Sequence, residues 1–177
     1  MNSCELINSK KVICDEIFYL EHEENDVSIE YFEDIPDGST ISGTVEVTLT
    51  DCNVFVVNDL FLVNFIFVVQ KELEITTPEP DSEIIPLEYL ERLQFEDIEF
   101  RKCSPAIIEE QGINLNDLKC EVIRTNARDT IELDTDNDSF DEDLNIEIKI
   151  KIIADVQEFI QGKDKELETV INVEDVG

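Results

Sequence analysis

The sequence predicts a mainly β protein, a jelly-roll-like antiparallel β-sandwich with one or two short helices. Residues 54–69 read VFVVNDLFLVNFIFVV, an almost uncharged run rich in Val and Phe, which is typical of buried strands. Residues 144–152 alternate Leu or Ile with polar side chains, the pattern of a half-buried strand. Ala is scarce and β-branched residues are abundant, which argues against a helical bundle.

The length of 177 residues fits one ordinary domain. A chain of this size buries roughly 70% of the surface of its unfolded form, so a full core is available. We expect an N-terminal arm at residues 1–12 and a single β-rich domain at residues 13–177. The proline-rich residues 76–86 mark a candidate sub-boundary within that domain.

Two strands are expected in the first 32 residues. Residues 11–20 (KVICDEIFYL) form the first strand, residues 21–26 a charged turn, and residues 27–32 (VSIEYF) the second. Pro36 and Gly38 follow in a turn, where Pro sets φ and Gly is free to adopt a positive φ.

The following strands flank a hairpin. Residues 41–49 alternate clearly, and Asn58-Asp59 interrupts the apolar run with residues that tolerate left-handed conformations. We therefore expect strands at residues 52–57 and 60–75. The latter is apolar on both faces over its first half, so the sandwich centre covers one face, and a helix, a loop or another subunit covers the other. One face comprises Phe61, Val63, Phe65, Phe67, Val69, Leu73 and Ile75, and the other Leu60, Leu62, Ile66 and Val68.

Two short helices are expected in the second half of the chain. Pro86 opens the first, in which three leucines are spaced by three residues. Ser104 is the expected N-cap of the second, with Pro105 at its first position and Gly112 as the C-cap. Further strands are expected at residues 118–124, 130–133 and 144–152, with an edge strand at 167–173.

Acidic residues dominate the composition. Asp and Glu total 44 against 13 Lys and Arg, a formal net charge of −31. Nucleic-acid binding needs a basic stripe and anionic membranes repel such a chain, so neither is an expected partner. The start of the chain lacks a basic segment followed by an apolar one, so we expect synthesis in the cytosol without a signal peptide. Residues 54–69 are too short for a membrane-spanning helix.

The sequence offers no specific catalytic motif. His22 is the only histidine, and its acidic neighbours favour a solvated residue on a turn. Carboxylate pairs are inevitable among so many acids, and the five glycines are scattered rather than gathered into a phosphate loop. We expect no catalytic activity and no required cofactor.

One acidic stretch is a candidate calcium site. Residues 134–143 place carboxylates at alternate positions, as at the start of a calcium loop. Ser139 stands where a helix–loop–helix motif needs Gly, and Asn145 where it needs a bidentate Glu. Two interpretations therefore stay open: a solvated acidic loop between strands, or a weak surface calcium site. The candidate ligands are Asp134, Asp136, Asp138 and Asp141.

Five cysteines cannot all pair within one chain, and none forms a C-x-x-C motif. Cys52 and Cys120 lie among strand-forming residues and fit free buried thiols. Cys4, Cys14 and Cys103 are the candidates for disulfides between subunits.

Several segments resemble the SPOCS-like coat and exosporium family of spore-forming Firmicutes. They are the early Cys4 and Cys14, ISGTVEVTLTDCNVFVVN running into FIFVVQKELEI, and IIPLEYLERLQFEDIEFRKCSP with Cys103. This resemblance implies β-rich modules that are made in the mother-cell cytosol and build spore layers or appendages. It also implies that other spore-surface proteins are candidate partners.

Two functions follow from these observations. The first is a structural protein that assembles with copies of itself by strand addition or by exchange of its N-terminal arm, locked by intermolecular disulfides. The alternative is an acidic, calcium-dependent binding module with no catalytic activity.

Overall fold

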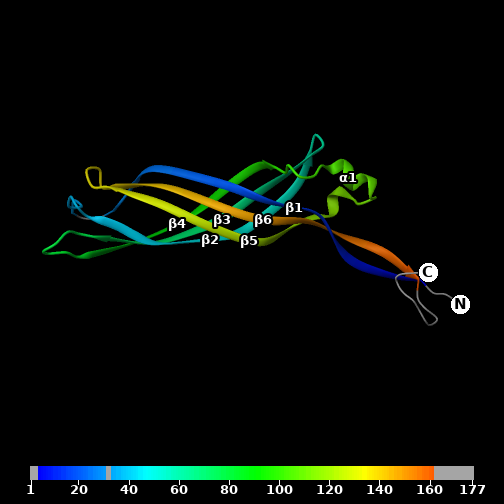
Figure 1. Ribbon diagram of the computed structural model, residues 1–177, viewed down its shortest axis with the longest axis horizontal. Helices are drawn as coiled ribbons and strands as arrows, with labels where there is room; N and C mark the ends of the chain where they lie inside the picture. The colour runs from blue at the N-terminus through cyan, green and yellow to red at the C-terminus, as the bar shows by residue number, and fades with distance from the viewer. Residues whose placement is uncertain (1–3, 31–32, 162–177) are drawn as a thin grey trace.

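The computed structural model describes residues 4–30 and 33–161 and has two packed antiparallel sheets (Figure 1). Sheet A has the strand order β1-β6-β5 and sheet B the order β2-β3-β4. The predicted β-sandwich is confirmed, with three strands in each sheet where a jelly roll has four. The elements are β1 (Cys4–Ser28), β2 (Thr40–Val57), β3 (Leu60–Thr76), β4 (Ile84–Glu99), α1 (Pro105–Glu110), the 3-10 helix η1 (Leu115–Asp117), β5 (Leu118–Asp134) and β6 (Ser139–Gln161).

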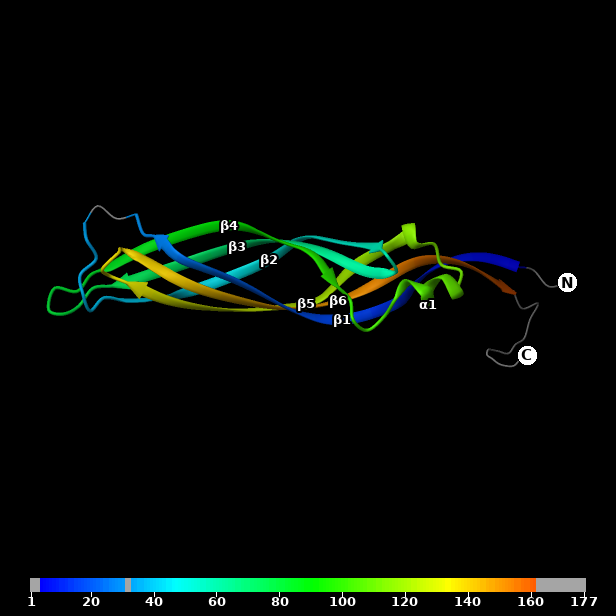
Figure 2. The same cartoon turned by 90° about the horizontal axis from the view of Figure 1, so that it is seen from above.

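Hairpins join most neighbouring strands. Asn58 and Asp59 connect β2 to β3 with φ values of 50° and 63°, which confirms the predicted turn. Sheet A instead pairs the first strand with the last, because β1 lies beside β6 over almost its whole length. The two sheets approach most closely along β2 and β5, and Figure 2 shows the resulting long, narrow sandwich from above.

The N-terminal strands differ from the prediction. Residues 11–20 and 27–32 were expected to be separate strands, but residues 4–28 form one strand with register shifts at Val12/Cys14 and Glu24/Val27. Asp26, with φ 57°, takes up the irregularity as a bulge rather than a turn. The cause is the long partner β6, which supplies hydrogen bonds on both sides of the charged segment.

The prediction of a helix after Pro86 was wrong, because this segment forms β4. In a strand, Leu87 and Leu93 share one face and Leu90 the other. Accordingly, Leu87 and Leu93 pack in the core and Leu90 is 72% exposed. Within the expected sub-boundary at residues 76–86, residues 77–83 connect β3 to β4 as a hairpin in one sheet.

The second predicted helix is confirmed as α1. Ser104 precedes it in an extended conformation and Pro105 takes the first position. Gly112 follows with φ 72°, a left-handed conformation that Gly adopts at low cost. The strands predicted at residues 118–124 and 130–133 are one strand, β5. The edge strand expected at 167–173 lies outside the described residues.

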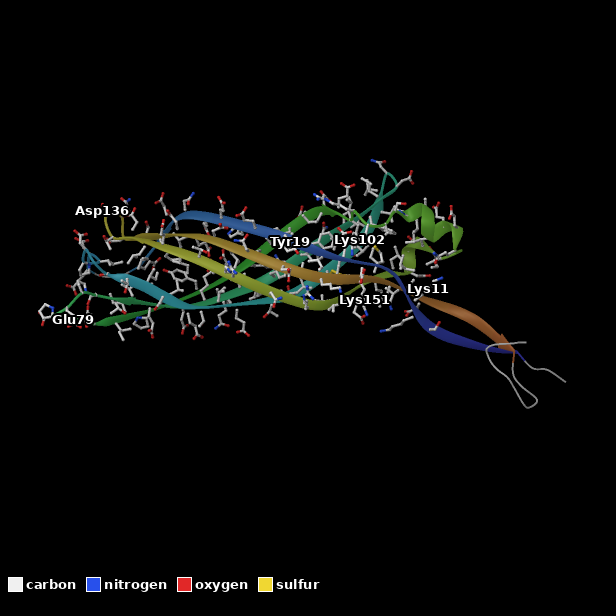
Figure 3. The ribbon with its side chains drawn as sticks, viewed as in Figure 1. Lys11, Tyr19, Glu79, Lys102, Asp136 and Lys151 are labelled. Atoms are coloured by element: carbon white, nitrogen blue, oxygen red, sulfur yellow. A yellow bond between two sulfur atoms is a disulfide. The ribbon has the colours of Figure 1, made fainter. Side chains whose placement is uncertain are left out.

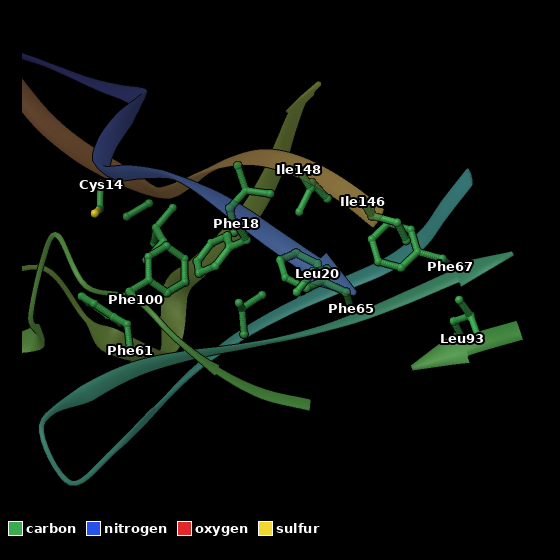
Figure 4. Close-up of a cluster of buried hydrophobic side chains, with 14 of the residues drawn as sticks. Cys14, Phe18, Leu20, Phe61, Phe65, Phe67, Leu93, Phe100, Ile146 and Ile148 are labelled. Atoms are coloured by element: carbon green, nitrogen blue, oxygen red, sulfur yellow. The ribbon is translucent and has the colours of Figure 1, made fainter. Parts of the chain in front are cut away.

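The Phe-rich face of β3 forms the centre of the core (Figure 4). Every member of the predicted face is at most 2% exposed. Sheet A of the same chain covers it: the ring of Phe18 lies 5.7 Å from Phe65 and 5.0 Å from Phe100. Each buried Phe contributes about 1.5–3 kcal/mol. The Phe-rich core therefore needs no neighbouring copy.

The opposite face of β3 points away from sheet A. Leu62, Ile66 and Val68 are only half-buried, and Leu60 is 40% exposed. No helix among the described residues packs extensively against β3. A helix of the same chain is therefore not the cover within the part of the chain that the structure describes, and a loop or another subunit as the cover stays a prediction.

Candidate functional site

A layer of charged side chains crosses the interior of the sandwich between two apolar clusters. One cluster is rich in Phe and lies toward α1, and the other, around Ile75 and Phe140, lies toward the opposite end. We call the residues between them the polar layer. It consists of His22 and Glu24 of β1, Lys71 of β3, Glu91 of β4, Asp129 of β5 and Glu142 of β6.

Strand register brings these residues together. His22 and Asp129 pair with Leu144 from opposite sides of β6, so the two side chains share the inner face of sheet A with that leucine. Glu24 pairs with Glu142 one step further along the same face. Lys71 continues the inward alternation of β3.

Lys71 is the centre of the layer. It is 2% exposed, and its ammonium group contacts Glu142 Oε2, Glu91 Oε1 at 3.4 Å and Asp129 Oδ2 at 3.5 Å. Burying a lysine without carboxylate partners costs several kcal/mol, so these ion pairs are needed to keep it in place. They also join sheet B to sheet A, because Asp129 and Glu142 lie on the other sheet.

Asp129 is held in an unfavourable environment. Its side chain is 4% exposed, and burial raises the pKa of this carboxyl. The nearby Lys71 ammonium opposes that rise, while the negative charges of Glu91 and Asp143 add to it. Neither oxygen of Asp129 receives a hydrogen bond within the described part of the chain.

His22 belongs to this layer rather than to a solvated turn, which corrects the sequence-based expectation. Its side chain is 29% exposed, and its Nε2 atom is buried. That nitrogen lies 3.6 Å from Glu24 Oε1 and has no hydrogen-bond partner among the described residues. Four carboxylates and one lysine leave the layer with an excess of negative charge.

Lys71 was missed in the sequence, although a signal was present. It occupies an inward position in an otherwise apolar alternation, directly between Val69 and Leu73. A charged residue at such a position is buried only with partners. The alternation does not say which acids supply them, since Asp129 and Glu142 are far away in the sequence.

The candidate calcium ligands lie at the β5–β6 hairpin, at the end of the sandwich opposite α1, where Figure 3 labels Asp136. Asp134 accepts hydrogen bonds from the Asp136 amide at 3.0 Å and the Asn137 side chain at 2.7 Å. Asp138 accepts from the Ile35 amide at 3.0 Å.

Asp141 completes this set by accepting from the Asp26 amide at 2.9 Å. Three of the four candidates therefore hold the loops of this end in place. The structure does not gather the four into a metal-binding cluster within the described residues. The solvated loop is the interpretation that these contacts favour, and the calcium site stays a prediction.

The cysteines are paired differently from the prediction. Cys14 bonds to Cys103 and Cys52 bonds to Cys120, both within one chain. Cys14 and Cys103 therefore do not join subunits, and Cys52 and Cys120 are not free thiols. The pairs had no local signal, because their partners lie 89 and 68 residues apart. Cys4 is left as the candidate for an intermolecular bond.

Both disulfides clamp the sandwich at the same level. Cys14 and Cys120 each pair with Ile152 of β6, one on either side of sheet A. Cys120 reaches Cys52 on β2 of sheet B, and Cys14 reaches the segment after β4. Next to Cys103, the buried carboxylate of Glu16 accepts hydrogen bonds from the amides of Arg101 and Lys102 at 2.8–3.1 Å.

The sandwich is open between β1 and β4. These strands pair only with β6 and β3, respectively, among the described strands, so each has a free edge. A cleft of about 520 Å³ lies between the two edges. Its lining comprises residues 16–19 of β1, Asp97, Ile98, Glu99 and Arg101.

A two-stranded ribbon extends beyond the sandwich (Figures 1 and 2). Residues 4–10 of β1 pair with residues 155–161 of β6, from Cys4 opposite Gln161 to Lys10 opposite Asp155. Strand β5 begins its pairing at Ala154, so no third strand accompanies this ribbon among the described strands. We call it the terminal ribbon. The N-terminal arm expected at residues 1–12 is thus paired with its own chain from Cys4 onward.

No helix in the described residues is long and apolar enough to cross a membrane. No protein-family model, curated protein or solved structure matches this chain. The class of protein is therefore defined by its architecture alone: a disulfide-clamped, acidic β-sandwich with a projecting ribbon.

Proposed function

We propose that this chain is a structural protein that assembles with copies of itself by strand addition, in a surface layer or appendage of spores. The observation that carries the assembly is the terminal ribbon. The spore surface is what the resemblance to the coat and exosporium family implies. The two disulfides support a final location that is oxidising.

A lone pair of strands is marginally stable in water, because its edges and faces lack partners. The terminal ribbon is such a pair, since β5 does not accompany it. Binding to another copy would complete its hydrogen bonding, as in other cases of strand addition. The free edges of β1 and β4 at the end opposite α1 are the strands that would receive it.

Charge favours a head-to-tail contact. Lys10, Lys11, Lys119 and Lys151 gather at the base of the terminal ribbon, and Figure 3 labels two of them there. The opposite end of the sandwich carries the acidic hairpins around Glu79 and Asp136 (Figure 3). A contact between two different ends of the same molecule propagates into a fibre unless its rotation closes a ring.

The large negative charge opposes assembly only at short range. Exposed charges are screened beyond about 8 Å at physiological ionic strength. Subunits that meet through the lysines at the base of the terminal ribbon also avoid placing acidic side chains directly against one another.

Light scattering and negative-stain images of the purified chain, with and without reductant, test the proposal. We expect oligomers or filaments for the full chain and monomers after deletion of residues 1–10. A Lys10→Glu/Lys11→Glu variant should weaken assembly, whereas Lys102→Glu, outside the terminal ribbon, should not. A Cys4→Ser variant should assemble but lose any resistance to dissociation in non-reducing gels. A monodisperse monomer of the full chain in oxidising buffer would overturn the proposal.

A further inference from the structure

We propose that the polar layer is a binding site for one divalent transition-metal cation, coordinated by His22, Glu24, Glu91 and Glu142. This site is separate from the terminal ribbon, so it does not depend on the proposed function. It would join both sheets at a point where neither disulfide reaches.

The geometry brings four potential ligands together. One ligand atom from each of these four residues lies within 4.8 Å of every other. Two atoms that bind the same cation at about 2.1 Å lie at most about 4.2 Å apart, so small side-chain movements suffice. The ligands come from β1, β4 and β6, and therefore from both sheets.

The buried carboxylate of Asp129 is a second observation that points to a missing cation. Its side chain is 96% buried, and neither oxygen receives a hydrogen bond among the described residues. Its nearest positive group is the Lys71 ammonium, at 3.5 Å. Burying a carboxylate that accepts no hydrogen bond costs free energy. Asp129 would therefore be stabilised by a Lys71 ammonium that it did not share with Glu91 and Glu142.

Lys71 connects these two observations. Its ammonium is now divided among Glu142, Glu91 and Asp129. A cation on Glu91 and Glu142 would release it to bind Asp129, whose oxygens have free acceptor capacity. Every carboxylate of the layer would then have a positive partner.

The charges support the same arrangement. With His22 neutral, the four carboxylates and Lys71 have a formal charge of −3, much of it buried. A divalent cation reduces this to −1. Such relief is large in an interior of low dielectric constant.

The donor set selects the kind of cation. One imidazole with three carboxylates suits Zn²⁺ or Mn²⁺ and their neighbours in the first transition row. Ca²⁺ and Mg²⁺ prefer oxygen ligands alone, and Ca²⁺ also takes six to eight of them. A preference for Zn²⁺ over Ca²⁺ therefore separates this site from the acidic hairpin around Asp136.

Calorimetric titration of the untagged, chelator-treated chain with Zn²⁺, Mn²⁺ and Ca²⁺ tests the proposal. We expect one Zn²⁺ per chain and an increase in the thermal midpoint, with binding lost in His22→Asn. That residue is only partly buried, so its replacement should leave the fold intact. A Glu23→Gln variant is the matched control, because Glu23 lies on the exposed face of the same strand.

Co²⁺ supplies a second, spectroscopic measurement. A cation bound by nitrogen and oxygen ligands inside the sandwich should give visible absorption bands that disappear in His22→Asn and persist in Glu23→Gln. The proposal is overturned if no ion binds, or if His22→Asn binds as tightly as the parent chain. Loss of binding on Asp134→Asn/Asp136→Asn instead would place the site at the hairpin and would also overturn it.

Discussion

At the end that carries α1, two disulfides and a cluster of Phe side chains hold the sheets together, whereas a smaller apolar cluster and hydrogen-bonded loops hold the opposite end. The disulfides Cys14–Cys103 and Cys52–Cys120 lie at one level of sheet A. At the other end, carboxylates of the β5–β6 hairpin bind the amides of Asp26 and Ile35. The polar layer separates these regions.

The two ends of the sandwich are therefore held together by different interactions. The disulfide-bonded end bears the terminal ribbon, so in the proposed assembly a pull from a neighbouring copy would reach the disulfide-bonded region first. The opposite end and the polar layer instead contain carboxylates that accept hydrogen bonds from loop amides or pair with Lys71. The following changes test that contrast, beginning with the largest expected effect.

Removal of one disulfide should have the largest effect on the free energy of unfolding. A Cys14→Ser/Cys103→Ser variant opens a link across 89 residues, which the chain-entropy relation values at about 4.6 kcal/mol of unfolding free energy. Urea unfolding measures the loss, and amide hydrogen exchange should show it concentrated near α1. Equal loss of protection at both ends would contradict the contrast. Cys4→Ser, which removes neither of the two disulfides, is the control.

Replacement of Lys71 tests the polar layer. Lys71→Met should cost about 3–5 kcal/mol, because Glu142 and Asp129 lose their buried cation. Urea unfolding in the presence of a chelator measures this without metal effects. Adding Glu142→Leu and Asp129→Leu should restore most of the stability, since an apolar layer needs no counter-charge. A triple variant as unstable as Lys71→Met would show that the layer does not act through charge.

A smaller effect is expected where β2 and β3 approach near the hydrogen-bonded end. A Cβ at Gly43 would collide with the Glu72 carbonyl oxygen and lie 2.7 Å from Leu73 Cα. Gly43→Ala should therefore cost about 1–3 kcal/mol, measured as a lower urea midpoint. Ser42→Ala, one residue earlier and exposed, should change the midpoint little. A neutral Gly43→Ala would show that this end is loosely packed.

The smallest effect concerns Lys119 and Asp155, which form a 2.8 Å ion pair at the base of the terminal ribbon. The hydrogen bond and charge of Lys119 lower the pKa of Asp155, and those of Asp155 raise the pKa of Lys119. The lowered pKa makes a stabilising contribution near neutral pH that is lost as the pH falls through it. The raised pKa of Lys119 makes a stabilising contribution at pH values below the usual lysine pKa. This contribution is lost as the pH rises through the raised pKa.

Both groups are solvent-exposed, so the contribution is small. Asp155→Asn should lower the thermal midpoint slightly at neutral pH and leave it unchanged in acid, where the carboxylate is already protonated. The measurement is the change in thermal midpoint that Asp155→Asn causes at each of the two pH values. A midpoint that differs equally from the parent at both pH values would rule out the ion pair as its cause.

Local chemistry predicted several elements well. The alternation in β3 placed seven apolar side chains on one face, and all seven are buried. Asn58-Asp59 predicted its hairpin, and Ser104, Pro105 and Gly112 predicted α1. These signals act over a few residues, so they need no knowledge of the partner strand.

Longer-range choices could not be predicted in this way. The leucines of β4 have a spacing that suits a helix, but pairing with β3 makes the segment a strand. The cysteine pairs and the polar layer join residues from distant strands, whose neighbours depend on register. Only His22, the single histidine, stood out beforehand as a position that needs an explanation.

The amino-acid sequence by itself determined a β-rich, strongly acidic chain with a Phe-lined interior, because side-chain alternation and composition are properties of neighbouring residues. The tertiary structure alone decided which cysteines bond, which acids surround Lys71, and that residues 4–10 and 155–161 leave the sandwich as one ribbon. Each of these depends on the pairing of β1 with β6 or on the packing of one sheet over the other. Such contacts arise between residues that lie far apart in the chain, and local propensity carries no information about them.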